Sequence, residues 1–215
     1  MMSPPERSPE RDATIDALLP HVPFDGWTRI ALSRALAATG QHPDDALLLF
    51  PGGAADMIET FCDLADRRML EDATALDLAV MRLPERVRAV IALRLARNRP
   101  HKEAIRRALG VLALPTNAPI AAACTARTVD AIWHAVGDNA ADFSWYTKRA
   151  SLAAIYAATL LFWLHDPSED NAATLAFLER RLTGIARIGT MRRRMEEILA
   201  RFTPPRFARV PSDAP

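Results

Sequence analysis

The sequence is poor in the residue patterns that build metal and redox sites. Its 215 residues include two cysteines, Cys62 and Cys124, which lie far apart and form no CxxC motif. This usage is typical of reduced, buried thiols in a cytosolic protein. Five histidines occur without HExxH or Glu-x-x-His, and only Asp130 and His134 lie one helical turn apart. Two potential ligands without a third favour a hydrogen bond or ion pair, so we expect no metal and no cofactor.

The motifs of common enzyme classes are also missing. There is no GxSxG nucleophile motif, no glycine-rich phosphate loop after a strand and no sustained period-two alternation. Almost every segment instead has the spacing of three and four that is typical of amphipathic helices. The sequence therefore predicts an all-α protein, and nothing in it indicates an enzyme. Catalysis would require a polar cluster inside the fold, which the sequence does not announce.

Neither end of the chain carries a targeting pattern. Residues 1–12 hold three prolines among charges of both signs, without the apolar run of a signal peptide or the acid-free helix of a transit peptide. We expect residues 1–11 and the proline-rich residues 204–215 to be disordered, and a cytoplasmic location. With half of its residues hydrophobic and a net charge of +1, the remainder suits one helical domain with a substantial core.

Apolar spacing, prolines and glycines predict the order of the helices. The expected ranges are 12–19, 28–39, a helix starting at Pro43, 54–71, 84–99, 121–136, 152–164, 171–188 and 190–202. The central helix, Leu152 to Leu164, contains no charge at all. Other helices or a ligand must enclose a helix that is apolar on every face. It is shorter than the roughly 20 residues that a membrane span needs.

The first three predicted helices have the outline of a helix-turn-helix module. Their pattern resembles the N-terminal head of the TetR superfamily, in which a DNA-binding head precedes a helical ligand-binding body. The residues that carry this resemblance are Trp27, Ile30, Ala31, Ala35, Gly40 and Phe50. From Ala35 to Asp66, however, there is no Lys or Arg. Phosphate contacts from these residues supply most of the affinity for DNA, so we expect a degenerate head. A TetR-type transcription regulator that senses a ligand remains the alternative.

Two segments are strongly basic. The predicted helix 84–99 carries five arginines around its apolar stripe: Arg86, Arg88, Arg94, Arg97 and Arg99. This pattern favours a solvated face over a surface for anionic lipid or an acidic partner. Near the C-terminus, arginines accompany an apolar stripe on residues 190–203. Such a basic amphipathic helix suits a membrane interface, and docking on its own domain or on a second subunit is equally compatible. The candidate membrane-contact residues are Met191, Arg192, Met195, Ile198, Leu199 and Phe202.

A longer resemblance covers the middle of the chain. Residues 130–135 (DAIWHA), 142–150 (DFSWYTKRA), 152–156 (LAAIY), 177–182 (FLERRL) and 112–115 (LALP) resemble the ubiquinone-biosynthesis accessory family of lipid-binding proteins with a TetR-like fold. The match is sharpest from residue 110 to 185 and extends loosely, in element order, from 12 to 200. Ser144 departs from the Asn that relatives often carry, and mitochondrial relatives have a transit peptide that this chain lacks.

This resemblance implies a function. Members of the family bind isoprenoid lipids in an apolar pocket, touch membranes through a C-terminal amphipathic helix and assist the di-iron hydroxylase that acts on demethoxyubiquinone. It implies that Trp145 and Tyr146 dock the hydroxylase, and we extend this patch to Asp142 and Arg149. Docking requires that Trp145 or Tyr146 be exposed, since Trp145 also suits a core position. We therefore expect a non-catalytic protein, a peripheral association with the bacterial inner membrane and no nucleic acid as partner.

The predicted layout is a helix-turn-helix-like head at 12–52, a lipid-binding body at 53–189 and the amphipathic segment at 190–203. The apolar stripe of helix 171–188 indicates core packing or a homodimer interface. For the lipid pocket, apolarity and order select six candidates, although core packing explains each of them equally well. These candidates are Met57, Phe61, Trp133, Tyr156, Leu160 and Trp163.

Overall fold

The computed structural model describes residues 4–137 and 144–184, and every regular element in these ranges is helical. The predicted all-α class is therefore confirmed. The α-helices are α1 (Pro9–Leu18), α2 (Val22–Asp25), α3 (Arg29–Ala38), α4 (Ala46–Leu49), α5 (Gly53–Ala73), α6 (Leu83–Arg97), α7 (Lys102–Leu112), α8 (Ala118–Ala135) and α9 (Ser144–His165). A further helix covers residues 172–184.

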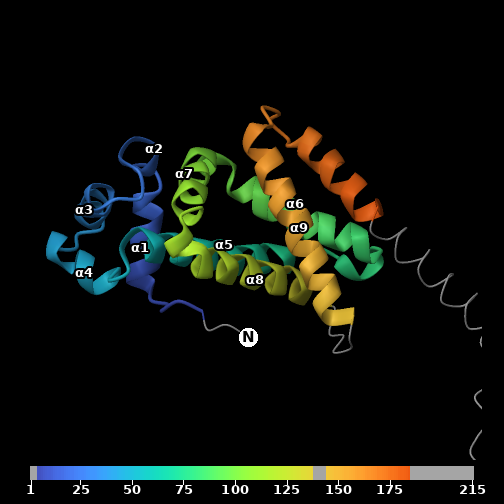
Figure 1. The fold of residues 1–215 in the computed structure, drawn as a ribbon, viewed down its shortest axis with the longest axis horizontal. Coiled ribbons are helices and arrows are strands. Elements are labelled where there is room, and N and C mark those ends of the chain that lie inside the picture. The colour runs from blue at the N-terminus through green and yellow to red at the C-terminus, as the bar shows by residue number, and fades with distance from the viewer. Residues whose placement is uncertain (1–3, 138–143, 185–215) are drawn as a thin grey trace, which may run out of the picture.

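The helices form a small head and a longer body. Figure 1 shows α1 to α4 gathered at one end of the molecule. From there α5 runs along the body with α8 beside it, and α7 stands across this pair near the head. The other half of the pair is covered by α6, α9 and the helix over 172–184. The long helix α5 thus belongs to both parts of the molecule.

Local sequence signals explain where several helices begin. The Ser8 hydroxyl accepts a hydrogen bond from the Arg11 backbone N–H, and Pro9 occupies the first turn of α1. The Thr28 hydroxyl caps α3 in the same way by accepting from the Ala31 N–H. At α6 the Glu85 carboxylate accepts from the Arg82 N–H at 2.9 Å, which satisfies one of the free donors at a helix start.

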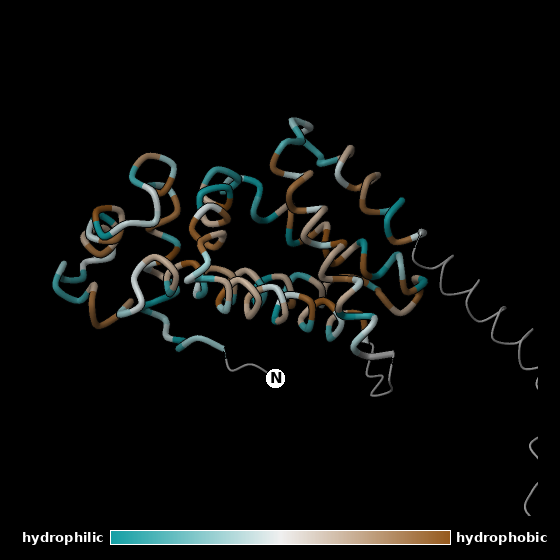
Figure 2. Tube along the Cα trace, viewed as in Figure 1, coloured by the Kyte–Doolittle hydropathy of each residue, from teal (hydrophilic) through white to brown (hydrophobic). Residues whose placement is uncertain are grey.

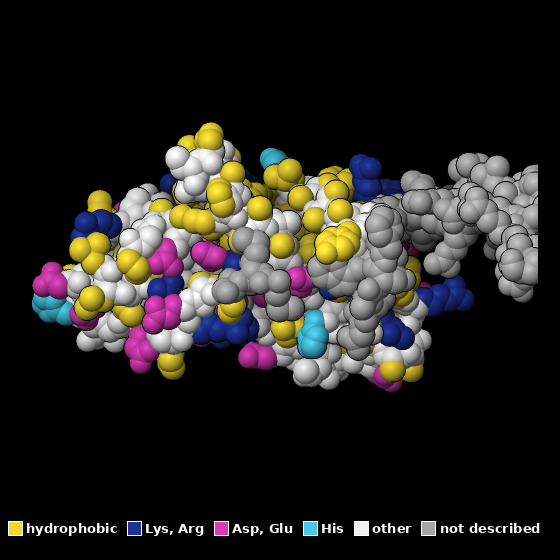
Figure 3. Space-filling model, turned by 60° about the horizontal axis from the view of Figure 1, so that its bottom comes forward, with side chains coloured by type: hydrophobic (Ala, Val, Ile, Leu, Met, Phe, Trp, Pro, Cys, Tyr) yellow, Lys and Arg dark blue, Asp and Glu magenta, His cyan; other side chains and the backbone are white. Residues whose placement is uncertain are grey.

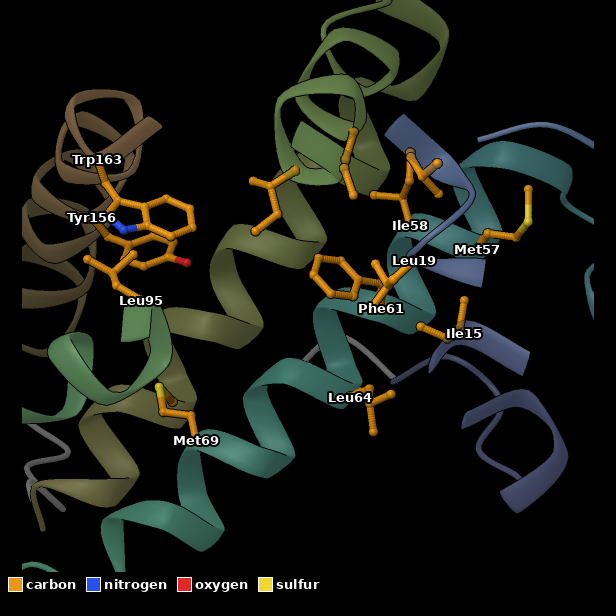
Figure 4. Packing of buried hydrophobic residues seen from close by; sticks show 14 of the residues in the cluster. Ile15, Leu19, Met57, Ile58, Phe61, Leu64, Met69, Leu95, Tyr156 and Trp163 are labelled. Atoms are coloured by element: carbon orange, nitrogen blue, oxygen red, sulfur yellow. The ribbon is translucent and has the colours of Figure 1, made fainter. Parts of the chain in front are cut away.

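One hydrophobic core joins the head to the body. Figure 4 shows Ile15 and Leu19 near Met57, Ile58 and Phe61 of α5, with the core continuing past Leu64 and Met69. At the far end the core includes Leu95, Tyr156 and Trp163. Each fully buried side chain of this size contributes about 1.5–3 kcal/mol, so the two parts are stabilised together.

A polar joint also fixes the head on α5. The buried guanidinium of Arg11 donates to the Thr60 hydroxyl at 2.6 Å, pairs with the Asp56 carboxylate at 2.5 Å and donates to the Leu49 carbonyl. It lies 4.6 Å from the centre of the Phe50 ring. Arg11 therefore ties α1, the end of α4 and α5 to one another.

Two expectations need correction. Within residues 1–11, the stretch expected to be disordered, residues 9–11 are helical because α1 begins at Pro9, and Arg7 pairs with Asp63. The arginines around α6 are not all solvated, because Arg94 is buried. The amphipathic segment 190–203 and its candidate membrane-contact residues lie outside the described residues.

Candidate functional site

A cavity of about 290 Å³ lies inside the body among α5, α6, α7, α8 and α9. Its volume is at the lower end for small-molecule sites, which start at about 300 Å³. Apolar side chains dominate the wall, and a few polar groups converge on one part of it. The lining residues that the following paragraphs use are Phe61, Cys62, Arg94, Ala121, Cys124, Thr125, Thr128, Tyr156, Leu160 and Trp163.

The structure brings four of the six pocket candidates to this cavity. Phe61, Tyr156, Leu160 and Trp163 line it, whereas Met57 and Trp133 do not. Met57 lies nearer the head on α5 and lines a second hollow, of about 260 Å³, beneath α3 and α4. Trp133 is buried in the core beyond the cavity, towards the end of α8. Apolar spacing identified the inward face of each helix, but not the position of the cavity along it.

The polar part of the wall is a cluster that sequence reasoning missed. Arg94 donates from Nε to the Tyr156 hydroxyl at 2.8 Å, and its Nη1 lies 2.7 Å from Asp66 Oδ1. The Arg94–Asp66 pair does not have the geometry of a hydrogen bond, so the two side chains interact mainly as opposite charges. The Thr128 hydroxyl donates to Asp66 Oδ2 at 3.0 Å. The cluster joins α5, α6, α8 and α9 around the cavity.

Burial changes the acid–base properties of this cluster. Loss of water contact raises the pKa of Asp66 to about 6, although the positive charge of Arg94 acts in the opposite direction. Burial also raises the pKa of Tyr156. The Asp66 carboxylate raises the pKa of Arg94 in spite of its burial, so the arginine stays charged. The cavity wall therefore combines apolar side chains with the charged Arg94, and Arg94 pairs with Asp66, which does not line the cavity and whose pKa is raised to about 6.

The end of α9 is held firmly beside the cavity. The indole N–H of Trp163 donates to Asn171 Oδ1 at 2.9 Å, and Lys102 Nζ lies 4.9 Å from the centre of the Trp163 ring. Asp166 accepts hydrogen bonds from the N–H and hydroxyl groups of both Ser168 and Thr174, which lower its pKa. These bonds fix the turn between α9 and the next helix, so Trp163 has one position in the cavity wall.

One stripe of α9 is not covered within the part of the chain that the structure describes. The stripe consists of exposed residues at helical spacing: Tyr146, Ala150, Ala154, Ala157 and Leu161. Apolar residues recur along the whole helix in Figure 2. The described residues therefore do not enclose this stripe, which was predicted to be covered by other helices or a ligand. Next to it, Phe162 is partly shielded, because its ring stacks on Phe177 with centroids 4.7 Å apart.

The candidate docking residues lie at the start of α9. Tyr146 is 73% exposed, so it meets the condition that docking imposes. Arg149 forms an ion pair with Asp130 of α8. The side chain of Trp145, and Asp142 altogether, lie outside the described residues. The structure brings Arg149 to an open groove of about 570 Å³ between α8 and α9, which is otherwise lined mainly by alanines.

This groove adjoins the cavity. Ala121 and Thr125 of α8 line both spaces, so one turn of α8 separates the interior from the surface beside Arg149. Neither side chain is large, and both are only partly exposed. The candidate pocket and the candidate docking surface are therefore neighbours, which the sequence did not show.

The head does not present a cationic surface at the position of a recognition helix. Residues 43–50 contain Asp44 and Asp45 and no Lys or Arg, and Leu47 and Leu48 are 59% and 79% exposed. Figure 3 shows acidic, histidine and hydrophobic side chains at this end of the molecule, with Lys or Arg side chains next to them. The surface of residues 43–50 repels a polyanion.

Neither a metal-binding cluster nor a single membrane-spanning helix occurs in the described ranges. Among these residues no group of three or more His, Cys, Asp or Glu side chains is placed to hold a metal ion. No single helix in residues 4–137 and 144–184 has the length and hydropathy of a membrane span. A bent pair, Arg99–Leu112 with Pro115–Ala135 at 98°, reaches them only jointly.

Comparison with solved structures shows the fold family. The chain is similar to a TetR transcriptional regulator from Nitrosomonas europaea ATCC 19718, with a TM-score of 0.67 and 24% sequence identity. The match covers 83% of this chain and 99% of the regulator. The predicted TetR-like fold is therefore confirmed, and at this identity the likeness concerns the fold alone.

Comparison of sequences points to one family. Residues 118–189, which include α8 and α9, match the COQ9 family model. The chain is 33% identical over 181 residues to the mitochondrial ubiquinone biosynthesis protein COQ9 of Homo sapiens, covering 81% of this chain and 57% of the human protein. The COQ9 protein of Drosophila melanogaster is 33% identical over 184 residues, with 80% and 54% covered. The chain spans just over half the length of these curated relatives. These matches confirm the predicted resemblance: over most of its length the chain is similar to the COQ9 proteins of ubiquinone biosynthesis.

Proposed function

We propose that this protein is a lipid-binding accessory protein of ubiquinone biosynthesis. Its cavity holds part of a polyisoprenoid quinone precursor, and the protein presents this lipid to a di-iron demethoxyubiquinone hydroxylase. The protein does not itself hydroxylate the lipid. The role in ubiquinone biosynthesis is inferred from the COQ9 relatives, which are named as ubiquinone biosynthesis proteins.

The observation that carries the proposal is the shared wall of cavity and groove. An apolar cavity suits a prenyl chain, because burial of each CH₂ group contributes about 0.8 kcal/mol. A cavity of 290 Å³ encloses only part of a long lipid, so the remainder has to lie outside. The groove beside Ala121 and Thr125 offers an apolar path to the surface that carries Tyr146 and Arg149. A hydroxylase docked there meets the lipid where it leaves the protein.

The other contacts follow from exposed or basic surfaces. The uncovered stripe of α9 around Ala157 and Leu161 is suited to a second copy of the chain, and we propose a homodimer. Residues 190–203, which lie outside the described ranges, supply the arginines and apolar side chains for a reversible peripheral contact with an anionic membrane. Liposome flotation with and without this segment tests the membrane contact.

The lipid claim is tested by closing the passage. Ala121 lines the cavity, whereas its neighbour Ala122 is exposed and lines only the groove. Native mass spectrometry of protein incubated with demethoxyubiquinone should show bound lipid for the wild type and for Ala122→Trp, and much less for Ala121→Trp. A protein that stays empty, or an Ala121→Trp variant that binds normally, contradicts the proposal.

The TetR-type regulator remains the second candidate because the solved neighbour is named as one. The acidic and apolar surface of residues 43–50 opposes it. A gel-shift experiment discriminates between the two. Sequence-specific binding to a DNA duplex that weakens as salt is raised would replace the accessory function with a regulatory one.

A further inference from the structure

The fold brings the two cysteines of the chain to one wall of the cavity. Cys62 comes from α5 and Cys124 from α8, the two helices that run side by side through the body (Figure 1), and both are free thiols. The two side chains interact with one another, and this interaction is the largest influence on the pKa of each thiol. The sequence alone predicted two reduced, buried thiols that lie far apart along the chain.

The two thiols have different environments. Arg127 Nη2 lies 3.7 Å from Cys124 Sγ, so a positive charge faces this sulfur. The interaction with Cys62, followed by the charge of Arg127, lowers the pKa of Cys124 although burial opposes this. The same interaction and burial raise the pKa of Cys62 well above its usual range. One thiol is thus disposed to be the thiolate and the other to remain protonated, which is the division of roles in reactive dithiols.

The position of the pair limits which oxidant reaches it. Both sulfurs belong to the wall of a mainly apolar cavity that also includes Leu160 and Trp163. A charged oxidant such as glutathione disulfide is poorly suited to that space. A neutral ring that accepts two electrons is well suited, and under the proposed function the head of the bound lipid belongs to the quinone class.

We propose that Cys62 and Cys124 form a redox-active dithiol that a quinone in the cavity oxidises to a disulfide between α5 and α8. The identity of the oxidant rests on the proposed function. In the reaction two S–H bonds break and one S–S bond forms. The two electrons pass to the quinone, and two protons convert its carbonyl oxygens to the hydroxyls of the quinol. The Cys124 thiolate first adds to a ring carbon of the quinone and forms a C–S bond. The Cys62 sulfur then attacks Cys124 Sγ, so the S–S bond forms as the C–S bond breaks and the ring leaves as the quinol.

The test uses the full-length reduced protein without oxygen and the soluble probe 2,3-dimethoxy-5-methyl-1,4-benzoquinone. Quinol formation is followed by ultraviolet absorbance, free thiols are counted with a thiol reagent, and the intact mass is measured. We expect free thiols to fall from two to none per chain, with one quinol formed and the mass of two hydrogens lost. Cys62→Ser and Cys124→Ser should each leave quinol formation at the rate seen without protein.

Other products overturn the proposal. A protein that gains the mass of the quinone has been alkylated, and a disulfide between two chains shows that the thiols are not a working pair. A second arm equilibrates the protein with dithiothreitol of varying redox state, where the intramolecular disulfide should also form. This experiment requires no lipid binding, so if no intramolecular disulfide forms in it, the proposed dithiol is contradicted whatever the protein binds.

The double variant Cys62→Ser/Cys124→Ser separates this proposal from the function on which it rests. If the double variant and the wild type both bind demethoxyubiquinone in native mass spectrometry while the wild type keeps both thiols with the quinone probe, the dithiol fails and the lipid function stands. If neither protein binds the lipid, the lipid function fails, and the dithiothreitol equilibrium still decides whether the thiols form a pair.

Discussion

Arg11 and Arg94 both hold a carboxylate of α5 inside the protein, one at the head and one beside the cavity. Around Arg11 the Asp56 carboxylate, the Thr60 hydroxyl and the Phe50 ring close the site, and Arg11 lines none of the cavities described above. Arg94 also lies near a carboxylate, with Nη1 2.7 Å from Asp66 Oδ1, but it borders open space. An arginine beside a carboxylate of α5 therefore holds helices together in the closely packed head, and the corresponding pair in the body places a charged group in the wall of the cavity.

The comparison separates stability from ligand binding. A change at the head joint should cost stability and leave the cavity lining in place, because Arg11, Asp56 and Thr60 do not line the cavity. A change at Asp66 should alter how the free energy of unfolding depends on pH. At low pH it should have little effect on that free energy, because Asp66 is then protonated and neutral. The following predictions test this separation, beginning with the largest effect.

Arg11→Ala should lower the free energy of unfolding by about 3 kcal/mol or more, because it removes the buried guanidinium that donates to the partly buried Asp56 carboxylate and to a backbone carbonyl. Urea denaturation measures the change. Arg180 is exposed, so Arg180→Ala should change the same quantity by less than about 0.5 kcal/mol. Equal effects of the two substitutions would show that Arg11 does not hold the head.

The second prediction concerns the pH dependence of Asp66. Its pKa in the folded protein, about 6, exceeds the ordinary value of 3.8 that applies to the unfolded chain, so folding favours the protonated form. The unfavourable contribution of Asp66 therefore grows as pH rises from about 4 to 6 and is complete above 6. Between pH 4 and pH 7 the unfolding free energy of the wild type should fall relative to that of Asp66→Asn, by about 3 kcal/mol at most. A difference that does not vary with pH contradicts this assignment.

Tyr156→Phe removes the oxygen that accepts from Arg94 Nε and keeps the aromatic ring in the cavity wall. We expect a loss of about 1 kcal/mol in the free energy of unfolding, measured by urea denaturation. Lipid occupancy in native mass spectrometry should be nearly unchanged, because the ring supplies the apolar contact. A loss of lipid as large as that from Ala121→Trp would show that the hydroxyl, and not the apolar wall, selects the guest.

The smallest effect on folding is expected at the start of α9. Tyr146 is exposed, so Tyr146→Ala should change the free energy of unfolding by less than about 0.5 kcal/mol. The affinity of the Tyr146→Ala variant for the hydroxylase, measured by surface plasmon resonance, should be lower than that of the wild type by a factor of at least about ten if Tyr146 is an anchor. Thr147→Ala, at the next exposed position, is the matched control and should bind normally. Equal affinities for all three proteins remove Tyr146 from the docking surface.

The sequence predicted much of the fold, because its helix ends carry local signals. Thr28 and Pro84 mark helix starts close to those observed, and the uncharged run ending before Pro167 marks α9. The start of α1 was missed by three residues, since Pro9 looked like part of a disordered tail although Ser8 caps the helix. Signals within a few residues of each other are visible in one sequence.

The candidate site was predicted only in part, because its key contacts join distant segments. Arg94 looked like one of several surface arginines, and its partners Asp66 and Tyr156 lie on other helices. The pairing of Cys62 with Cys124 likewise depends on how α5 and α8 pack. Helical spacing shows which direction a side chain faces, but tertiary packing determines its depth and its partner.

The central claim is that the guest enters the body and not the head. A polyisoprenoid probe with a photoreactive diazirine on its chain, crosslinked to the protein and mapped by peptide mass spectrometry, tests it most directly. The account predicts labels on cavity residues of α5, α8 and α9, such as Phe61, Thr125 and Leu160, and competition by unlabelled demethoxyubiquinone. Labels confined to the exposed Leu47 and Leu48 of the head, or labelling that the competitor does not reduce, would contradict it.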